Sequence, residues 1–138
     1  MGKVFDSSTG FKLSNGAVRS PDVSWISLNR WNSLNKQQKR GFARGLQAPE
    51  LNSGDSPSPI NPDFVIELVS PTDDVKDLQK KMTEYMSCGV KLGWLINPDR
   101  KQAEIYRVDK DKEVLNNPCS LSGETILPNL TINLSNIF

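Results

Sequence analysis

Two carboxylates lie in stretches of sequence that favour β-strands, and their residue type is suited to binding a hard cation. Asp22 lies in RSPDVSWIS, residues 19–27, and Glu67 lies in NPDFVIELVS, residues 61–70. If the two strands are neighbours in one sheet, they are about 4.8 Å apart, and both carboxylates can reach one hard cation. The backbone carbonyl of Leu68 is a candidate third oxygen ligand.

Glu67 is the more unusual of the two acids, because it interrupts a nearly continuous apolar run. A run such as FVIELV is typical of a strand that is buried on both faces. A buried carboxylate is costly unless it is paired or binds a metal ion. Two interpretations therefore stay open: Glu67 is a site residue, or it is a structural acid paired with Lys81 or Arg19.

Lys81 could supply a positive charge beside these acids. It lies in SPTDDVKDLQKKMTEYMSCG, residues 70–89, which is the clearest helical segment. The apolar face of this helix consists of Val75, Leu78, Met82, Tyr85 and Met86. Lys80 points away from that face, whereas Lys81 borders it. A lysine there can orient a water molecule or stabilise a pentavalent phosphate, or it can simply lay its stem on the core.

Asp63 shares the second strand with Glu67 but is a poor candidate for the same site. The two residues are four positions apart on a strand, so about 13 Å separates them. That distance is too long for one ion to bind both. We therefore expect Asp63 to be a strand-start residue, and Asp22 to be the acid that joins Glu67.

The composition excludes several kinds of chemistry. The sequence contains no histidine, which rules out Ser-His-Asp and Cys-His mechanisms and most zinc hydrolases. Cys88 and Cys119 are too few for a structural zinc site. The net charge is +1, so nucleic-acid binding would need a local basic patch. Such a patch could be the run Lys36, Lys39, Arg40 and Arg44, which is otherwise a solvated helix face.

The elements that would position these residues form an α/β pattern. Residues 1–27 read as β-structure with a hairpin turn at the NG pair, residues 15–16. Residues 28–45 read as short helix, with Asn35 as a cap for a helix from Lys36 to about residue 42. Residues 46–61 are rich in Pro, Ser and Gly, and we expect residues 46–59 to be mobile. We expect Ser70 or Thr72 to cap the long helix.

The second half of the chain predicts a parallel crossover. LGWLINP, residues 92–98, reads as a buried strand, and QAEIYRVD, residues 102–109, as an alternating one. A long helix between two buried strands favours parallel pairing, so the sheet should be mixed. Ile137 and Phe138 end the chain and are expected to dock on the core. The length of 138 residues predicts one domain over residues 1–138.

The location that the sequence favours is the cytoplasm, with no membrane partner. No apolar run approaches the roughly 20 residues that span a bilayer. The first ten residues, MGKVFDSSTG, contain no apolar stretch typical of a secretory signal peptide.

Several segments in a fixed order resemble one known family. SPDVSWI, PDFVIELVSPTD, LQKKMTEY, GVKLGWLINP and EIYRV are similar to the Uma-type putative restriction endonuclease family of the PD-(D/E)XK nuclease superfamily. The resemblance extends from about Val4 to the C-terminus, apart from the 43–61 region. It implies a restriction-endonuclease-like core, a mixed sheet flanked by helices. It also implies that Asp22, Glu67 and Lys81 are the catalytic residues.

Three departures from the family pattern accompany this resemblance. The lysine that usually stands two residues after the second acid is replaced by Val69, and Lys81 matches a lysine that the family takes from the next helix. The family's N-terminal helical segment is expected to be missing. Residues 43–61 look like an insertion of unknown role.

The resemblance implies a Mg²⁺- or Mn²⁺-dependent DNA endonuclease that hydrolyses phosphodiester bonds with an activated water molecule. The alternative is a catalytically inactive nuclease-fold module that binds nucleic acid or a protein partner. A sheet face or edge left uncovered by the missing segment would favour a homodimer.

Overall fold

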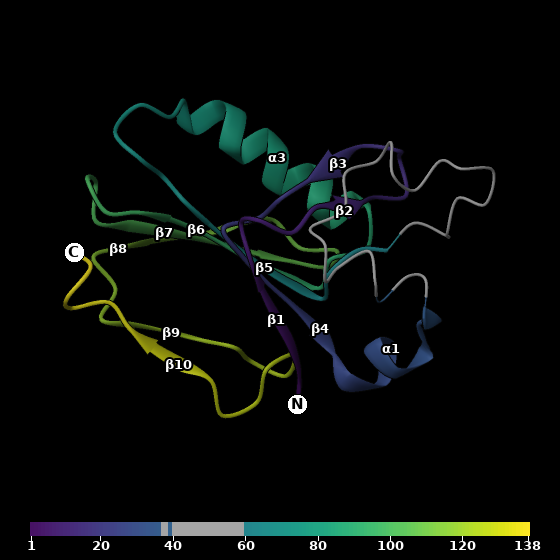
Figure 1. Ribbon diagram of the computed structural model, residues 1–138. Helices are drawn as coiled ribbons and strands as arrows, with labels where there is room; N and C mark the ends of the chain where they lie inside the picture. The colour runs from purple at the N-terminus through teal and green to yellow at the C-terminus, as the bar shows by residue number, and fades with distance from the viewer. Residues whose placement is uncertain (37–38, 40–59) are drawn as a thin grey trace.

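A six-stranded mixed sheet forms the centre of the protein (Figure 1). The computed structural model describes residues 1–36, 39 and 60–138. The strand order is β1-β4-β5-β6-β7-β8. The bounds are β1 Gly2–Asp6, β4 Val23–Ser27, β5 Phe64–Leu68, β6 Leu92–Asn97, β7 Gln102–Arg107 and β8 Glu113–Asn116. β5 and β6 pair in parallel and the other neighbours pair antiparallel, which confirms the predicted mixed sheet.

The parallel pair β5–β6 is connected by the long helix α3, Val75–Ser87. Leu78, Met82 and Tyr85 are its buried residues, as the helical spacing predicts. Gly93 on β6 lets α3 lie close to the sheet, because a Cβ there would be 2.7 Å from the terminal methyl of Met82. The helix ends before Gly89, whose φ of +103° suits glycine.

The start of α3 differs from the prediction that Ser70 or Thr72 caps the helix. Asp74 is the N-cap, and its carboxylate accepts a hydrogen bond from the Lys76 backbone N–H. Ser70 instead donates its backbone N–H and its hydroxyl to Asp73 in the preceding turn. An Asp directly before the first helical residue caps as well as a Ser would, so the helix begins four residues after Pro71.

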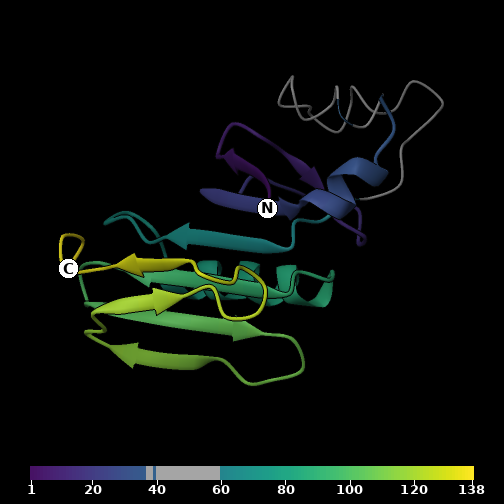
Figure 2. The ribbon, with the colours of Figure 1, turned by 90° about the horizontal axis from the view of Figure 1, so that it is seen from below.

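Both faces of the sheet are covered within the part of the chain that the structure describes. Helix α3 lies on one face, together with the hairpin of β2, Phe11–Lys12, and β3, Val18–Arg19. The hairpin of β9, Ser120–Ser122, and β10, Thr131–Asn133, lies on the other face (Figure 2). The α3 side buries Phe11, Leu13, Ile26, Val65, Leu78, Met82, Tyr85, Cys88, Val90, Leu95 and Tyr106. The other side buries Phe64, Ile66, Leu92, Trp94, Ile96, Ala103, Ile105, Leu121 and Leu134. This arrangement explains why β5 is apolar on both faces.

The N-terminal region forms four short strands, β1 to β4, in the segment that reads as β-structure. β2, Phe11–Lys12, pairs with β3, Val18–Arg19, through the turn predicted at residues 15–16. Gly16 has a φ of +88°, which an Asn-Gly turn favours. The Leu13 backbone N–H donates to the Ala17 carbonyl and closes the hairpin. The hairpin lies against α3 and carries Arg19 towards the helix.

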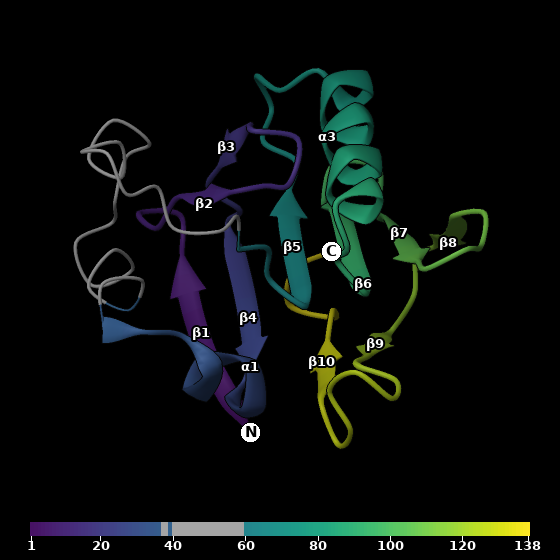
Figure 3. The ribbon, with the colours of Figure 1, turned by 90° about the vertical axis from the view of Figure 1, so that its right-hand side faces the viewer.

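The first helix, α1, lies in the segment 28–45 that reads as short helix. α1 spans Leu28–Ser33, and Ser27 caps it by accepting a hydrogen bond from the Arg30 N–H. Figure 3 shows α1 at the end of β4, beside β1. The helix predicted from Lys36 to about residue 42 and the mobile loop predicted for residues 46–59 fall largely or wholly outside the described residues.

The end of the chain docks on the core only in part. Phe138 packs against the apolar cluster on the β9–β10 side, as expected. Ile137 is 40% exposed, so its predicted docking is wrong. The backbone N–H groups of both residues donate to the Leu134 carbonyl in a tight turn. A turn of this kind directs neighbouring side chains differently, so only one of them meets the core.

Asp63 fixes the start of β5 and is 1% exposed. Its carboxylate accepts the Ser27 backbone N–H at 2.8 Å and lies 2.9 Å from Arg30 and 3.4 Å from Lys91. It therefore connects β5 to the start of α1, which agrees with the expected structural role.

We expect Asp63→Asn to lower the free energy of unfolding by about 2 kcal/mol, because two charge-assisted contacts lose their acceptor charge. Arg30 and Lys91 are partly exposed and can regain water, which limits the cost. Asp99→Asn, in an exposed turn, is the matched control and should change stability by about 0.5 kcal/mol or less. Urea denaturation measures both, and equal stability of the two variants would contradict the role of Asp63.

Candidate active site

Asp22 and Glu67 lie at the same end of neighbouring strands. The β4–β5 register pairs Val23 with Ile66, so Asp22, one residue earlier, lies across from Glu67. The Asp22 carboxylate accepts the Leu68 backbone N–H at 2.7 Å. Strand alternation directs Asp22 towards the same face as Ile26, which is the α3 face. The predicted adjacency of the two strands is therefore confirmed.

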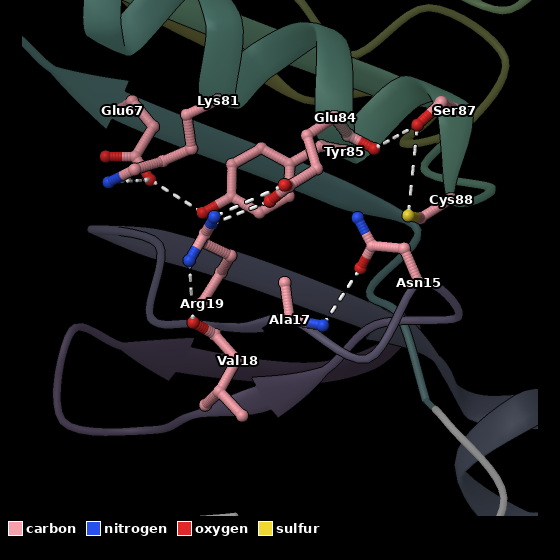
Figure 4. A network of polar contacts seen from close by, with 10 residues as sticks. All are labelled: Asn15, Ala17, Val18, Arg19, Glu67, Lys81, Glu84, Tyr85, Ser87 and Cys88. Atoms are coloured by element: carbon pink, nitrogen blue, oxygen red, sulfur yellow. Dashed lines mark hydrogen bonds and ion pairs between the residues drawn. The ribbon is translucent and has the colours of Figure 1, made fainter.

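Glu67 is almost completely buried, with 3% of its surface exposed. The Tyr85 hydroxyl donates a 2.9 Å hydrogen bond to Oε1 of Glu67. The Lys81 ammonium lies 3.8 Å from the same oxygen (Figure 4). Lys81 and Tyr85 are four residues apart on α3, so both side chains leave the same side of the helix. The structure thus brings together Asp22, Glu67 and Lys81.

The electrostatics of Glu67 disfavour its charged form. Burial raises the pKa of Glu67, and the Asp22 and Asp73 charges add to that increase. Lys81 and the Tyr85 hydroxyl act in the opposite direction but do not outweigh burial. A carboxylate held near other acids and away from water is stabilised by a bound cation, because the cation offsets both the repulsion and the lost solvation.

The donor set fits a divalent cation of the Mg²⁺ type. Among the described residues, no hydrogen bond reaches Oε2 of Glu67 or Oδ1 of Asp22. Residues 1–36, 39 and 60–138 contain no group of three or more acidic, Cys or His residues arranged to hold a metal. Mg²⁺ commonly uses one or two carboxylates and completes its shell with water and substrate phosphate, so two carboxylates suffice. The Leu68 backbone, tied to Asp22, borders the same place.

Tyr85 and Asp73 are the residues near this site that sequence reasoning did not assign. Tyr85 was counted only as part of the apolar helix face, and nothing in its spacing indicates that its hydroxyl meets Glu67. Hydrogen bonds from the Ser70 backbone and side chain lower the pKa of Asp73, which keeps it charged. Its position in an exposed turn before α3 gave only the signal of a helix N-terminus.

Two other polar side chains have partners other than Glu67. Arg19 forms a double hydrogen bond with Glu84, at 2.6 and 3.2 Å, so the alternative pairing of Glu67 with Arg19 is wrong. Gln79, also on α3, donates to Glu104 on β7 at 2.8 Å. The cause is the orientation of α3, whose successive turns cross different strands.

The basic run is only partly described. Lys36 is exposed, and the Lys39 ammonium lies 5.6 Å from the centre of the Trp31 ring. The Lys3 ammonium lies at a similar distance from this ring, 5.7 Å. Such cation–π contacts stabilise the start of this segment. Arg40 and Arg44 lie outside the described residues.

The fold is that of a known nuclease-like structure. The chain superposes on the crystal structure of a "putative nuclease belonging to DUF820" from Anabaena variabilis ATCC 29413 with a TM-score of 0.72 and 21% sequence identity. The match covers 99% of this chain and 68% of that chain. A search of curated proteins finds no match. No helix among the described residues is long and apolar enough to cross a membrane.

The family model for Uma2, described as "Putative restriction endonuclease", matches residues 1–135. The chain therefore belongs to the Uma2 family, as its motifs predict. Family and fold together define a nuclease-like protein.

Proposed function

We propose that the protein is a Mg²⁺- or Mn²⁺-dependent DNA endonuclease whose site consists of Asp22, Glu67 and Lys81. The observation that carries this proposal is the pairing of β4 with β5, which sets Asp22 beside Glu67, with the Lys81 ammonium 3.8 Å from Glu67. Membership of a restriction endonuclease family supports it independently.

Each of the three residues has a distinct role in this proposal. Asp22 and Glu67, with the Leu68 carbonyl, would hold the ion. When bound, the ion lowers the pKa of a water molecule and neutralises charge on the scissile phosphate. The Lys81 side chain is 32% exposed, so its ammonium can reach a phosphate or an attacking water at the surface. It stabilises the charge that develops on the phosphate oxygens.

Cleavage of supercoiled plasmid DNA by the purified protein tests this function. Nicked and linear products should form with Mg²⁺ or Mn²⁺ and should not form with EDTA. The absence of metal-dependent products under all ionic conditions would reject the enzyme.

The second candidate is an inactive nuclease-fold module that binds nucleic acid or a protein. One oxygen of Glu67 is already occupied by Tyr85 and Lys81, so the acid could serve the fold alone. DNA binding without cleavage in the plasmid assay would support this candidate.

Nucleic-acid binding should depend strongly on salt. The net charge is +1, so affinity must rest on Lys36, Lys39, Arg40, Arg44 and Lys81. Four or five phosphate contacts predict a slope of about −4 for log K against log salt concentration. Fluorescence anisotropy at several salt concentrations between about 50 and about 200 mM measures this slope. Affinity that does not change with salt would show that these residues do not contact phosphate.

We also propose that the protein is a cytoplasmic homodimer. β1 is an edge strand of the sheet, and its Val4 is 70% exposed. An exposed apolar edge favours strand pairing with a second copy. Sedimentation that shows a monomer at micromolar concentration would exclude the dimer, and fractionation of cells would test the location.

A further inference from the structure

We propose that Tyr85 is a positioning residue for Glu67, and that its hydroxyl holds Oε1 so that Oε2 is left to bind the cation. The inference rests on the proposed function and adds to it a residue outside the three motif positions. Its basis is the way in which two buried carboxylates on the same face of the sheet are bonded.

Tyr85 is fixed tightly enough to orient a partner. Its side chain is 0% exposed and belongs to the apolar cluster between α3 and the sheet. Met82, one turn earlier, is also 0% exposed and packs over Gly93 of β6. A ring that is enclosed on this scale has little freedom, so the position of its hydroxyl oxygen is set by the fold.

The β2–β3 hairpin is bonded to the end of α3 that carries Tyr85. Arg19 donates two hydrogen bonds to Glu84, the neighbour of Tyr85, and a third to the Val18 carbonyl. Figure 4 shows the Arg19 side chain close to the Tyr85 hydroxyl. These two hydrogen bonds to the Glu84 carboxylate resist rotation of the helix, which would move the Tyr85 hydroxyl away from Glu67.

The donors around Glu67 converge on one oxygen. The Tyr85 hydroxyl and the Lys81 ammonium both approach Oε1. In Figure 4 the other oxygen of Glu67 points away from Tyr85. A carboxylate anchored through one oxygen presents the second in a defined direction, which is the usual function of hydrogen bonds to metal-binding groups.

Glu104 provides an internal comparison. It lies in the same row of the sheet as Glu67, because Leu95 pairs with Glu67 on one side and with Glu104 on the other. Tyr106 and Lys112 contact its Oε1, and Gln79 donates to its Oε2. Both oxygens of Glu104 therefore accept a hydrogen bond, whereas among the described residues only Oε1 of Glu67 does so. The difference indicates that Glu67 is arranged for a further ligand and Glu104 for the fold.

Tyr85→Phe and Tyr106→Phe test the inference as a matched pair. Each change keeps the ring and removes one hydroxyl that donates to a buried carboxylate. The hydrogen bond lost is 2.9 Å long for Tyr85 and 2.7 Å long for Tyr106. Mg²⁺ binding is measured by calorimetry on DNA-free protein, and cleavage is measured across a range of Mg²⁺ concentrations. Thermal melts check that both variants are folded.

We expect Tyr85→Phe to weaken Mg²⁺ binding about 10- to 100-fold. The Mg²⁺ concentration for half-maximal cleavage should rise by the same factor, while the rate at saturating Mg²⁺ stays close to that of the wild type. Tyr106→Phe should leave both quantities unchanged.

Two results would overturn the inference about Tyr85 without rejecting the proposed function. One is a wild-type protein that cleaves DNA while Tyr85→Phe binds Mg²⁺ equally well. The other is an equal loss of Mg²⁺ affinity in Tyr106→Phe, which would assign the effect to any lost buried hydrogen bond. A wild-type protein that neither binds Mg²⁺ nor cleaves would instead reject the proposed function, and with it the ion that Tyr85 is proposed to serve.

Discussion

Glu67→Gln is expected to abolish Mg²⁺-dependent cleavage and to leave the protein folded. The substitution keeps the shape of the side chain but removes the charge that binds the cation. Burial raises the pKa of Glu67, so the charged form is costly in the folded protein. Removing that charge should leave the free energy of unfolding unchanged or raise it by about 1 kcal/mol. Plasmid cleavage and thermal melts with and without Mg²⁺ measure the two effects.

The pH dependence of stability gives a further check on the same variant. The raised pKa means that folded protein holds the Glu67 proton more tightly than the unfolded chain does. The contribution of this group to the free energy of unfolding therefore falls as pH rises from the ordinary Glu pKa through the raised one. Glu67→Gln lacks this decrease, so its stability relative to the wild type should increase over that pH range.

The structural alternative predicts the opposite result. If Glu67 and Lys81 serve only as a buried ion pair, either single change leaves one charge without a partner and costs roughly 3–5 kcal/mol. A large loss of stability in Glu67→Gln, together with no effect of Mg²⁺ on the wild-type melt, would reject the assignment of Glu67 to a metal site.

Lys81→Ala is expected to slow cleavage by about 10²-fold or more while Mg²⁺ binding is largely kept. The reason is that the ammonium acts on the water or the phosphate and not on the ion, so its loss raises the barrier of the chemical step. Single-turnover cleavage at saturating Mg²⁺ measures the rate, and calorimetry measures the binding of the ion.

Lys80→Ala is the matched control for this variant. Lys80 is the neighbouring residue on α3, carries the same charge and is exposed on the side of the helix away from the core. It should cleave at close to the wild-type rate. If Lys80→Ala and Lys81→Ala are slowed equally, the effect belongs to the general positive charge that attracts DNA, and Lys81 has no specific role.

The sequence was sufficient for the strands and the helix that carry the site. β5 is apolar at every position except Glu67, and this exception identified the acid before any contact was known. The helical spacing of Leu78, Met82 and Tyr85 identified α3, and a helix between two buried strands predicted their parallel pairing. These features depend on burial and on the repeat of a helix or strand, both of which are local properties of the chain.

The partners of each polar side chain were decided by the tertiary structure alone. Periodicity placed Lys81, Tyr85 and Gln79 on α3, but only the angle at which the helix crosses the sheet brings the first two to Glu67 and the third to Glu104. The sequence left Arg19 as a possible partner of Glu67, but the position of the β2–β3 hairpin pairs it with Glu84. A hydrogen bond requires a donor within about 3 Å, and a spacing rule locates a side chain only to one face of an element. The sequence by itself therefore determined which acid is anomalous, and the fold determined that a tyrosine hydroxyl and a lysine meet one of its oxygens.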